Sequence, residues 1–150
     1  MAFAYSPTMA DRYYTEYPFP GGGWFAVCLS GTEEPLGRAG LVLRGDLYEP
    51  PEIEMAYGLA DQHRGNGYAT EACKALFGYA LKELGLPRLF AGVHINNLSS
   101  QRVAERIGLH YELTIDWYGE KHKMYWYRKT SDRSETLRGG GTQQSGGHVR

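Results

Sequence analysis

The sequence has few residues that could form a cross-link or bind a metal. It contains two cysteines and five histidines in 150 residues. Cys28 falls in a strand-like pattern and Cys73 on the apolar side of a helical pattern, so we expect small buried side chains in a reducing compartment. This pattern disfavours a disulfide or a cysteine nucleophile. The histidines have no ligand spacing with each other or with cysteine, which argues against a metal site.

Long apolar runs and an excess of charge are also absent. No run approaches the roughly 18 residues of a membrane span, and the N-terminus lacks a basic stretch followed by an apolar one. The net charge of −1 gives no electrostatic reason to expect binding to nucleic acid or to an anionic membrane. We therefore expect a cytoplasmic protein with neither partner. Its 150 residues are enough for one domain with a buried core.

One stretch, residues 53–84, organises the rest of the chain. Residues 53–59 alternate apolar side chains with small or acidic ones, which predicts a strand. Residues 69–84 carry apolar side chains at helical spacing, and Gly85 follows where that helix should end. Between the two elements lies a glycine-rich turn over residues 64–69. The order is therefore strand, tight turn and long helix.

The turn predicts a pocket for an anion. The first backbone N–H groups of a helix have no partner inside it, and the helix dipole places partial positive charge there. Gly65 and Gly67 let the backbone turn sharply and let an anion approach without meeting a Cβ. We expect a phosphate or pyrophosphate to bind at this point. The plainer interpretation, a glycine turn that only caps the helix, is the alternative.

Three phosphate-binding patterns can be compared with this turn. A Walker loop ends in Gly-Lys-Ser/Thr, which is absent here. A dinucleotide-binding turn needs a third glycine where this chain has Thr70 and Glu71. The third pattern, R/Q-x-x-G-x-G/A, is matched by Arg64, Gly67 and Ala69. It resembles the acetyl-CoA pyrophosphate loop of the GNAT N-acetyltransferases.

The resemblance extends over about residues 24–128 and is to the RimJ/RimL-type branch of that superfamily. A strand with an acidic residue and a tyrosine precedes the R-G-x-G-Y-A-T-E-A loop and helix. A further strand, an N-x-x-S helix start at Asn97 and Ser100, and a closing helix ending Ile-Gly-Leu follow in matching order. The resemblance implies direct transfer of an acetyl group from acetyl-CoA, a co-substrate, to a primary amine, without a metal. The amine would belong to a protein N-terminus or to a small molecule.

The expected fold class is α+β or α/β, with a mixed, mostly antiparallel sheet, a central splayed parallel strand pair and flanking helices. The acetyl-CoA-binding domain should span residues 24–129, after an irregular segment over residues 1–23 and before a disordered tail over residues 130–150. A short helix could form over residues 9–17. The other expected elements are strands over residues 24–29, 36–43, 89–95, 110–118 and 123–129, and a helix over residues 98–107.

The N-terminal segment departs from the family pattern. GNAT domains normally open with a strand and one or two helices, and residues 1–23 are too short and too interrupted by proline and glycine to supply all of them. Either the first strand is missing or the segment replaces it in an unusual way. An incompletely covered sheet edge beside residues 24–29 would favour a homodimer. Two alternatives to an enzyme follow, a non-catalytic CoA-binding or regulatory module and a truncated family member.

The resemblance assigns candidate catalytic residues. Glu54 is the candidate for proton removal, usually through a water in this family, although it could equally be a strand carboxylate that faces solvent. Glu52 is a weaker candidate. The tyrosine that protonates the leaving thiolate in many members is replaced by Ala104. Ser100 could then polarise the thiolate, and Asn97 would lie near the pantetheine, unless both merely cap a helix.

The same match predicts how the cofactor binds. The strands over residues 53–59 and 89–95 should splay apart and hold the pantetheine between them, while backbone N–H groups of the turn hold the pyrophosphate. Arg102 could reach a CoA phosphate but is more simply a solvated helix residue. The expected cofactor-binding residues are Tyr57, Leu59, Arg64, Gly65, Asn66, Gly67, Tyr68, Ala69, Thr70 and Asn97.

Overall fold

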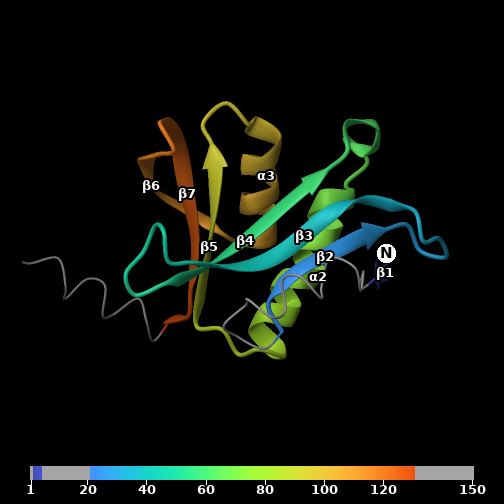
Figure 1. Ribbon diagram of the computed structural model, residues 1–150, viewed down its shortest axis with the longest axis horizontal. Coiled ribbons are helices and arrows are strands. Elements are labelled where there is room, and N and C mark those ends of the chain that lie inside the picture. The colour runs from blue at the N-terminus through green and yellow to red at the C-terminus, as the bar shows by residue number, and fades with distance from the viewer. Residues whose placement is uncertain (1, 5–20, 131–150) are drawn as a thin grey trace, which may run out of the picture.

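A computed structural model of the chain describes residues 2–4 and 21–130 (Figure 1). Within these ranges the strands form one seven-stranded sheet with the order β1-β2-β3-β4-β5-β7-β6. Every neighbouring pair is antiparallel except β4 and β5, which are parallel. The elements are β1 (Ala2–Ala4), β2 (Gly23–Cys28), β3 (Pro35–Arg44), β4 (Glu52–Leu59), the short 3-10 helix η1 (Asp61–His63), α2 (Tyr68–Lys82), β5 (Arg88–His94), α3 (Leu98–Ile107), β6 (His110–Trp117) and β7 (Glu120–Arg128).

This architecture confirms the predicted fold class, and the predicted strands and helices of residues 24–129 are present with bounds shifted by a few residues. The largest shift is at β7, which begins at Glu120 rather than at residue 123. The hairpin turn consists of Tyr118 and Gly119, with φ angles of 51° and 79°. Two residues with positive φ make the tight turn that suits a twisted hairpin, so pairing resumes at once.

The structure corrects the prediction for the N-terminal segment in one respect. Ala2–Ala4 forms the strand β1, which pairs antiparallel with β2 in the register Ala2↔Cys28 to Ala4↔Ala26. The short β1 covers the second half of β2, so the edge beside β2 is partly covered. This strand could not be predicted, because three residues are too few to show an alternating pattern.

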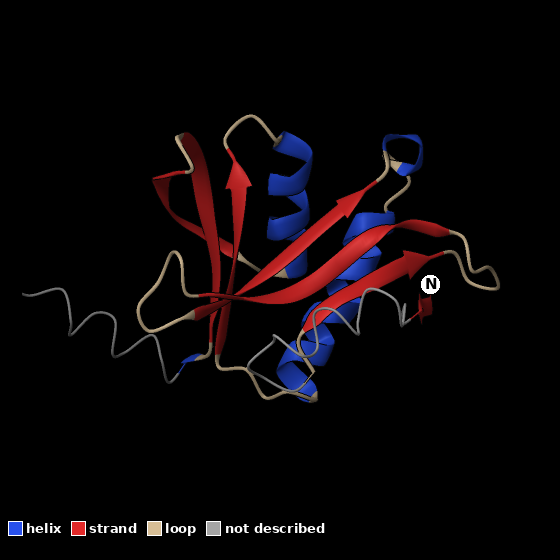
Figure 2. Ribbon diagram, viewed as in Figure 1, coloured by secondary structure: helices blue, strands red, loops and turns tan. Residues whose placement is uncertain are grey.

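Helices α2 and α3 cover one face of the sheet (Figure 2). A shared core lies between them and the sheet, and it includes Leu41, Met55, Leu76, Leu89, Ala104 and Ile107. On the other face, Phe90, Met124 and Trp126 form a smaller cluster, against which Leu47 and Tyr48 of the β3–β4 loop pack. The two faces explain the alternating pattern of the central strands.

Both cysteines belong to the buried interior, as predicted. Cys28 and Cys73 are free thiols, exposed by 2% and 0% of their surface. Burial raises the pKa of the Cys73 thiol to about 12. This thiol therefore stays protonated at neutral pH and packs as a small apolar side chain.

The parallel strands β4 and β5 touch at one end and separate at the other. Within the described residues, Glu54↔Phe90 is the register pair that joins them. Figure 1 shows the two strands diverging toward their C-terminal ends, with α3 beside the opening. The diverging part of each strand leaves backbone N–H and C=O groups without a neighbouring strand on that side, so an extended ligand could pair with them. This confirms the predicted splayed pair.

Some expectations concern residues that the structure does not describe. The possible helix over residues 9–17 lies outside the described residues, and so does the predicted tail apart from residue 130. Among residues 2–4 and 21–130, no helix is long and apolar enough to cross a membrane. The same residues contain no group of three or more histidine, cysteine, aspartate or glutamate side chains placed to hold a metal ion.

Candidate active site

The turn between β4 and α2 has the geometry of an anion pocket. Gly65 and Gly67 adopt φ angles of +81° and +78°, and a Cβ built on either would meet no atom within 4 Å. Gly67 is the N-cap of α2, and the first helical bond is donated by Glu71 N–H to the Gly67 carbonyl at 3.0 Å. The backbone N–H groups that come before Glu71 at the start of α2 therefore have no acceptor within the helix. Left-handed glycines beside open space leave these donors accessible to a phosphate.

A cavity of about 340 Å³ lies where β4 ends, α2 begins and α3 begins. All of the cofactor-binding residues predicted from the sequence line it, with the exception of Asn66. The Asn66 side chain turns back and donates to the carbonyls of His63 and Arg64 at 3.4 and 3.3 Å. Its amide therefore braces the turn instead of facing the cavity. The predicted residues that do line the cavity are Tyr57, Leu59, Arg64, Gly65, Gly67, Tyr68, Ala69, Thr70 and Asn97.

Three arginines give this cavity a positive rim. Arg64 forms an exposed ion pair with Asp61 at 3.0 Å. Arg102 and Arg106 lie one turn apart on α3 and also line the cavity. Arg102 is exposed and lines the cavity, so both interpretations of it stay open, whereas Arg106 was not among the residues expected from the sequence. The spacing of four residues between the two was the available signal, because it places both on one helix face.

A second cavity of about 140 Å³ lies between β4 and β5. It shares Tyr57, Asn97 and Ser100 with the larger cavity, so the two adjoin at the start of α3. Glu54 lines the second cavity and is absent from the lining of the first. The anion pocket and this carboxylate therefore belong to different cavities that meet at the start of α3.

Glu54 is buried, which rules out the interpretation of a carboxylate that simply faces solvent. Only 7% of its surface is exposed. Burial raises its pKa above the ordinary value, against the opposing effects of the Arg44 charge and a hydrogen bond from the Gly92 N–H. The Glu52 carboxylate, by contrast, accepts two bonds from Arg88 at 2.9 and 2.8 Å. Of the two carboxylates, Glu54 is the one that faces a cavity.

The start of α3 combines a capping role with a place beside both cavities. Asn97 Oδ1 accepts hydrogen bonds from Ser100 N–H and from Ser99 Oγ, each at 3.1 Å. Asn97 is therefore the N-cap, as the plainer interpretation held, and it still lines both cavities together with Ser100. The Tyr57 hydroxyl donates to the Ser100 carbonyl at 2.7 Å. Burial raises the pKa of this tyrosine, which keeps the donor protonated.

Ala104 is fully buried in the main core. It lines neither of the two cavities, so the absence of a side-chain acid at this position stays an expectation from the resemblance. Gln101 is a further residue at the site that was not predicted, and it is only 6% exposed. Its Nε2 donates to the carbonyls of His94 and Ile95 at 3.3 and 2.8 Å, and its Oε1 accepts from Lys123 Nζ at 3.1 Å. Gln101 thus ties α3 to the end of β5 and fixes the open end of the strand pair.

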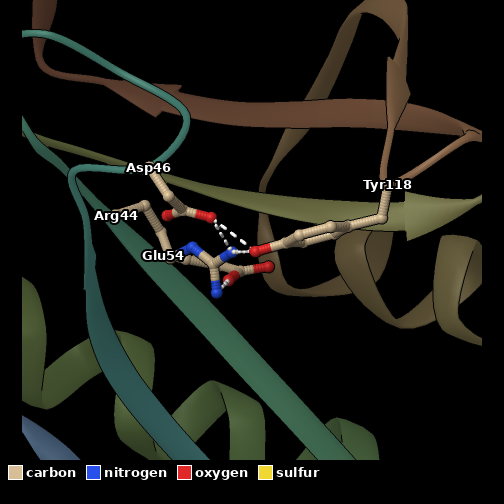
Figure 3. A network of polar contacts seen from close by, with 4 residues as sticks. All are labelled: Arg44, Asp46, Glu54 and Tyr118. Atoms are coloured by element: carbon tan, nitrogen blue, oxygen red, sulfur yellow. Dashed lines mark hydrogen bonds and ion pairs between the residues drawn. The ribbon is translucent and has the colours of Figure 1, made fainter.

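A polar cluster on the Glu54 side was also missed (Figure 3). Arg44 Nη2 donates to Asp46 Oδ2 at 2.6 Å, and Tyr118 Oη donates to the same oxygen at 2.8 Å. Burial alone would raise the pKa of Asp46, but the bonds from Tyr118 and Arg44 outweigh it and hold the pKa below its ordinary value. Tyr118 comes from a distant part of the chain, so no local pattern could have predicted this contact.

The two cavities together suit a ligand that is anionic at one end and extended toward the other. A phosphorylated ligand can place its anionic groups at the glycine turn and the α3 arginines, and an extended arm can follow the opening between the strands. The far end of such an arm would lie near Glu54, Ser100 and the edges of β4 and β5. Coenzyme A has this combination of pyrophosphate and extended arm, and the open space at Gly65 and Gly67 fits its phosphates.

Comparisons with known proteins agree with this description. The model of the acetyltransferase (GNAT) domain family matches residues 2–110. The uncharacterized protein YkkB of Bacillus subtilis is 36% identical over 94 residues, which cover 63% of this chain and 54% of YkkB. The crystal structure of an acetyltransferase from Agrobacterium tumefaciens is 33% identical with a TM-score of 0.64, covering 80% of this chain and 66% of that one.

A more distant solved structure contains coenzyme A. The aminoglycoside acetyltransferase AAC(6')-Ib in complex with coenzyme A has a TM-score of 0.61 and 16% identity, covering 75% of this chain and 69% of that one. At this identity the likeness concerns the fold alone. The chain spans about half the length of YkkB, the curated relative compared above. The family match over residues 2–110, together with the shared fold, shows that the chain belongs to the GNAT acetyltransferase family.

Proposed function

We propose that this protein transfers an acetyl group from acetyl-CoA to a primary amine by direct attack in a ternary complex. The amine would belong to a protein N-terminus or to a small molecule. The observation that carries the proposal is the pair of adjoining cavities, with an anion-binding turn on one side and a buried carboxylate on the other. A cofactor and an acceptor could approach the same point from opposite sides.

The cofactor would be held mainly by backbone groups. The N–H groups over residues 64–70 would bind the pyrophosphate, and Arg102 and Arg106 would add positive charge to the same cavity. The pantetheine arm would lie along the separating part of β4, near Tyr57 and Leu59, and would pair with backbone groups that β5 no longer satisfies. This arrangement would place the thioester beside Ser100.

The reaction needs a neutral amine. An α-amine with a pKa of about 7.8 costs about 1 kcal/mol to deprotonate at pH 7, whereas a lysine amine at about 10.4 costs about 4.6 kcal/mol. Glu54 would accept the proton, directly or through a water, and its raised pKa makes it a better base than an exposed carboxylate. The neutral amine nitrogen then attacks the thioester carbonyl carbon, the C–S bond breaks, and CoA leaves as the thiolate. The nitrogen loses its second proton, which solvent carries to the thiolate, so the products are the amide and the free CoA thiol.

The leaving group would be stabilised without a side-chain acid from α3. The resemblance places Ala104 at the position of the family's tyrosine, and an alanine has no proton to give. The Ser100 hydroxyl could donate a hydrogen bond to the thiolate, which lowers its energy without protonating it. Since a thiolate is a much better leaving group than an alkoxide, this contribution would suffice.

One observation favours a second candidate function. The absence of the acid at Ala104 is also what a non-catalytic CoA-binding or regulatory module would show. The two functions differ in turnover and not in CoA affinity. The test is release of free thiol from acetyl-CoA in the presence of a panel of amines, with CoA binding measured separately by calorimetry. Binding with amine-dependent thiol release supports the enzyme, and binding without it supports the module.

A further inference from the structure

Arg44, at the end of β3, lies between two carboxylates. Its Nη2 is bonded to Asp46 Oδ2 at 2.6 Å, and its Nη1 lies 3.6 Å from Glu54 Oε2. The guanidinium also lies over the Trp117 ring, 4.6 Å from the ring centroid. Figure 3 shows the guanidinium between the two carboxylates. Asp46 and Trp117 fix this side chain on one side while it reaches Glu54 on the other.

Tyr118 provides the second anchor for this cluster. Its hydroxyl donates to Asp46 Oδ2 at 2.8 Å and accepts from Arg44 Nη2 at 3.5 Å. The residue has a φ of 51°, which is rare for a bulky side chain. Tyr118 is 79% exposed, so apolar burial does not account for its position. The two hydrogen bonds are what join the β6–β7 turn to the β3–β4 loop here.

We propose that Arg44 is a positioning residue: it holds the Glu54 carboxylate in place and in its charged form. Asp46 and Tyr118 in turn fix the arginine. The proposal rests on the proposed function, in which Glu54 accepts the proton of the amine. Arg44 does not line the cavity between β4 and β5 and would act only through Glu54. The Arg44 guanidinium also neutralises part of the negative charge that a buried carboxylate would otherwise carry alone.

The charged groups around Glu54 determine in which direction its pKa should shift when Arg44 is removed. Burial raises the pKa of Glu54, and the largest opposing influence is the Arg44 charge, followed by the hydrogen bond from the Gly92 N–H. Asp46 acts in the same direction as burial, and His122 on β7 acts against it. His94 on β5 lines the same cavity. Loss of Arg44 therefore leaves burial largely unopposed, and the pKa of Glu54 should rise further.

The chain contains a matched control in the neighbouring ion pair. Arg88 binds Glu52 with two bonds, and Glu52 lies two residues before Glu54 on the same strand. Arg88→Gln removes the same charge and breaks a closer pair, and Arg88 is not among the charges that act on the pKa of Glu54. A general loss of stability near β4 would affect both variants. An effect carried by Glu54 would appear in Arg44→Gln alone.

The experiment follows the Glu54 carboxyl carbon by NMR as pH is varied, in the full chain with coenzyme A, with Glu54→Gln used for assignment. The pH profile of kcat/KM for an amine acceptor is measured in parallel. Arg44→Gln should raise the pKa of Glu54 by about 1 unit or more and move the ascending limb of the rate profile by the same amount. Arg44→Lys should restore most of the shift, Tyr118→Phe should give a smaller shift in the same direction, and Arg88→Gln should give none.

An unchanged Glu54 titration in folded Arg44→Gln overturns the proposal, and so does an equal shift in Arg88→Gln. If Arg44→Gln does not fold, Tyr118→Phe decides, because an unchanged titration in that variant overturns the proposal as well. A wild-type protein that binds coenzyme A but acetylates no amine contradicts the proposed function instead. In that case the NMR titration still reports on Arg44, so the two failures are distinguishable.

Discussion

Glu54 in β4 stands directly opposite Phe90 in β5, and within the described residues this pair is where the two parallel strands meet. Phe90 is fully buried in the cluster on the face away from the helices. The apolar packing of Phe90 holds the strands together at Glu54, and beyond this point they separate around the two cavities. The same contact therefore fixes the carboxylate and opens the space into which a thioester would extend.

The first prediction concerns the glycine turn. Gly67→Val should lower the affinity for coenzyme A at least tenfold, or about 1.4 kcal/mol, because the side chain would occupy space where phosphate oxygens approach. The control is Gly31→Val, since Gly31 has the same kind of φ at +81° and equally open surroundings. Calorimetric titration that finds equal affinities for the two folded variants would remove the assignment of the turn.

The second prediction concerns the hydrogen bond between β4 and α3. Tyr57→Phe should lower the free energy of unfolding by about 0.5–1.5 kcal/mol, because the Ser100 carbonyl loses its donor. It should also weaken coenzyme A binding, because Ser100 lines both cavities. Tyr79→Phe is the matched control, since it removes a 3.3 Å bond to the Gly21 carbonyl away from the site. Urea unfolding and calorimetry should show lower stability in both variants but weaker binding only in Tyr57→Phe.

The third prediction concerns stability and pH. The folded protein keeps the proton on Glu54 above the ordinary pKa of 4.5, where the unfolded chain has released it. The free energy of unfolding should therefore fall as the pH rises from 4.5 through the raised pKa. Glu54→Gln should remove this part of the pH dependence, and Glu34→Gln, at an exposed position, should not. Denaturant unfolding between pH 4 and pH 8 measures how the free energy of unfolding depends on pH. The same pH dependence in wild type and Glu54→Gln would contradict a pKa of Glu54 that burial raises.

The fourth prediction concerns the amine. Glu54→Gln should slow acetylation of lysine-like acceptors more than that of α-amines, because only the former face the deprotonation cost of about 4.6 kcal/mol. Rates with an α-amine peptide and with a polyamine provide the comparison. Equal losses for the two classes would mean that Glu54 has a structural role and that another group accepts the proton.

The fifth prediction concerns the leaving group. With Ala104 in the position of the acid, kcat/KM should show an ascending limb and no descending limb up to about pH 9.5. A thiol with a pKa of about 8.5 can leave as the thiolate once it accepts hydrogen bonds. A descending limb near neutral pH would reveal an acid elsewhere in the site.

The sequence was most informative where the determinants were local. The alternation of residues 53–59, the glycines of the turn and the cap at Asn97 each depend on neighbours along the chain, so periodicity and turn chemistry predicted them. Most of the residues that the resemblance led us to expect at the cofactor also line the larger cavity. Asn66 is the exception, because the direction of a turn side chain depends on which carbonyls lie within its reach.

Contacts between distant segments could not be predicted in this way. Tyr118 meets Asp46 across 72 positions, and Arg88 selects Glu52 rather than Glu54 only because of the strand register. Gln101 sits on the buried face of α3, where the helical pattern predicts an apolar residue. Each of these depends on how the strands are ordered in the sheet, which composition and periodicity do not specify.

The most direct test of the account is an acetyl-transfer assay that measures thiol release and product mass together. Wild-type protein, acetyl-CoA and a panel of α-amine peptides, polyamines and amino acids should give amine-dependent thiol release and an equal amount of singly acetylated product. Gly67→Val should lower the rate at subsaturating acetyl-CoA, and Gly31→Val should not. Coenzyme A binding by wild-type protein with neither thiol nor acetylated amine across the panel would contradict the account and identify a binding module instead.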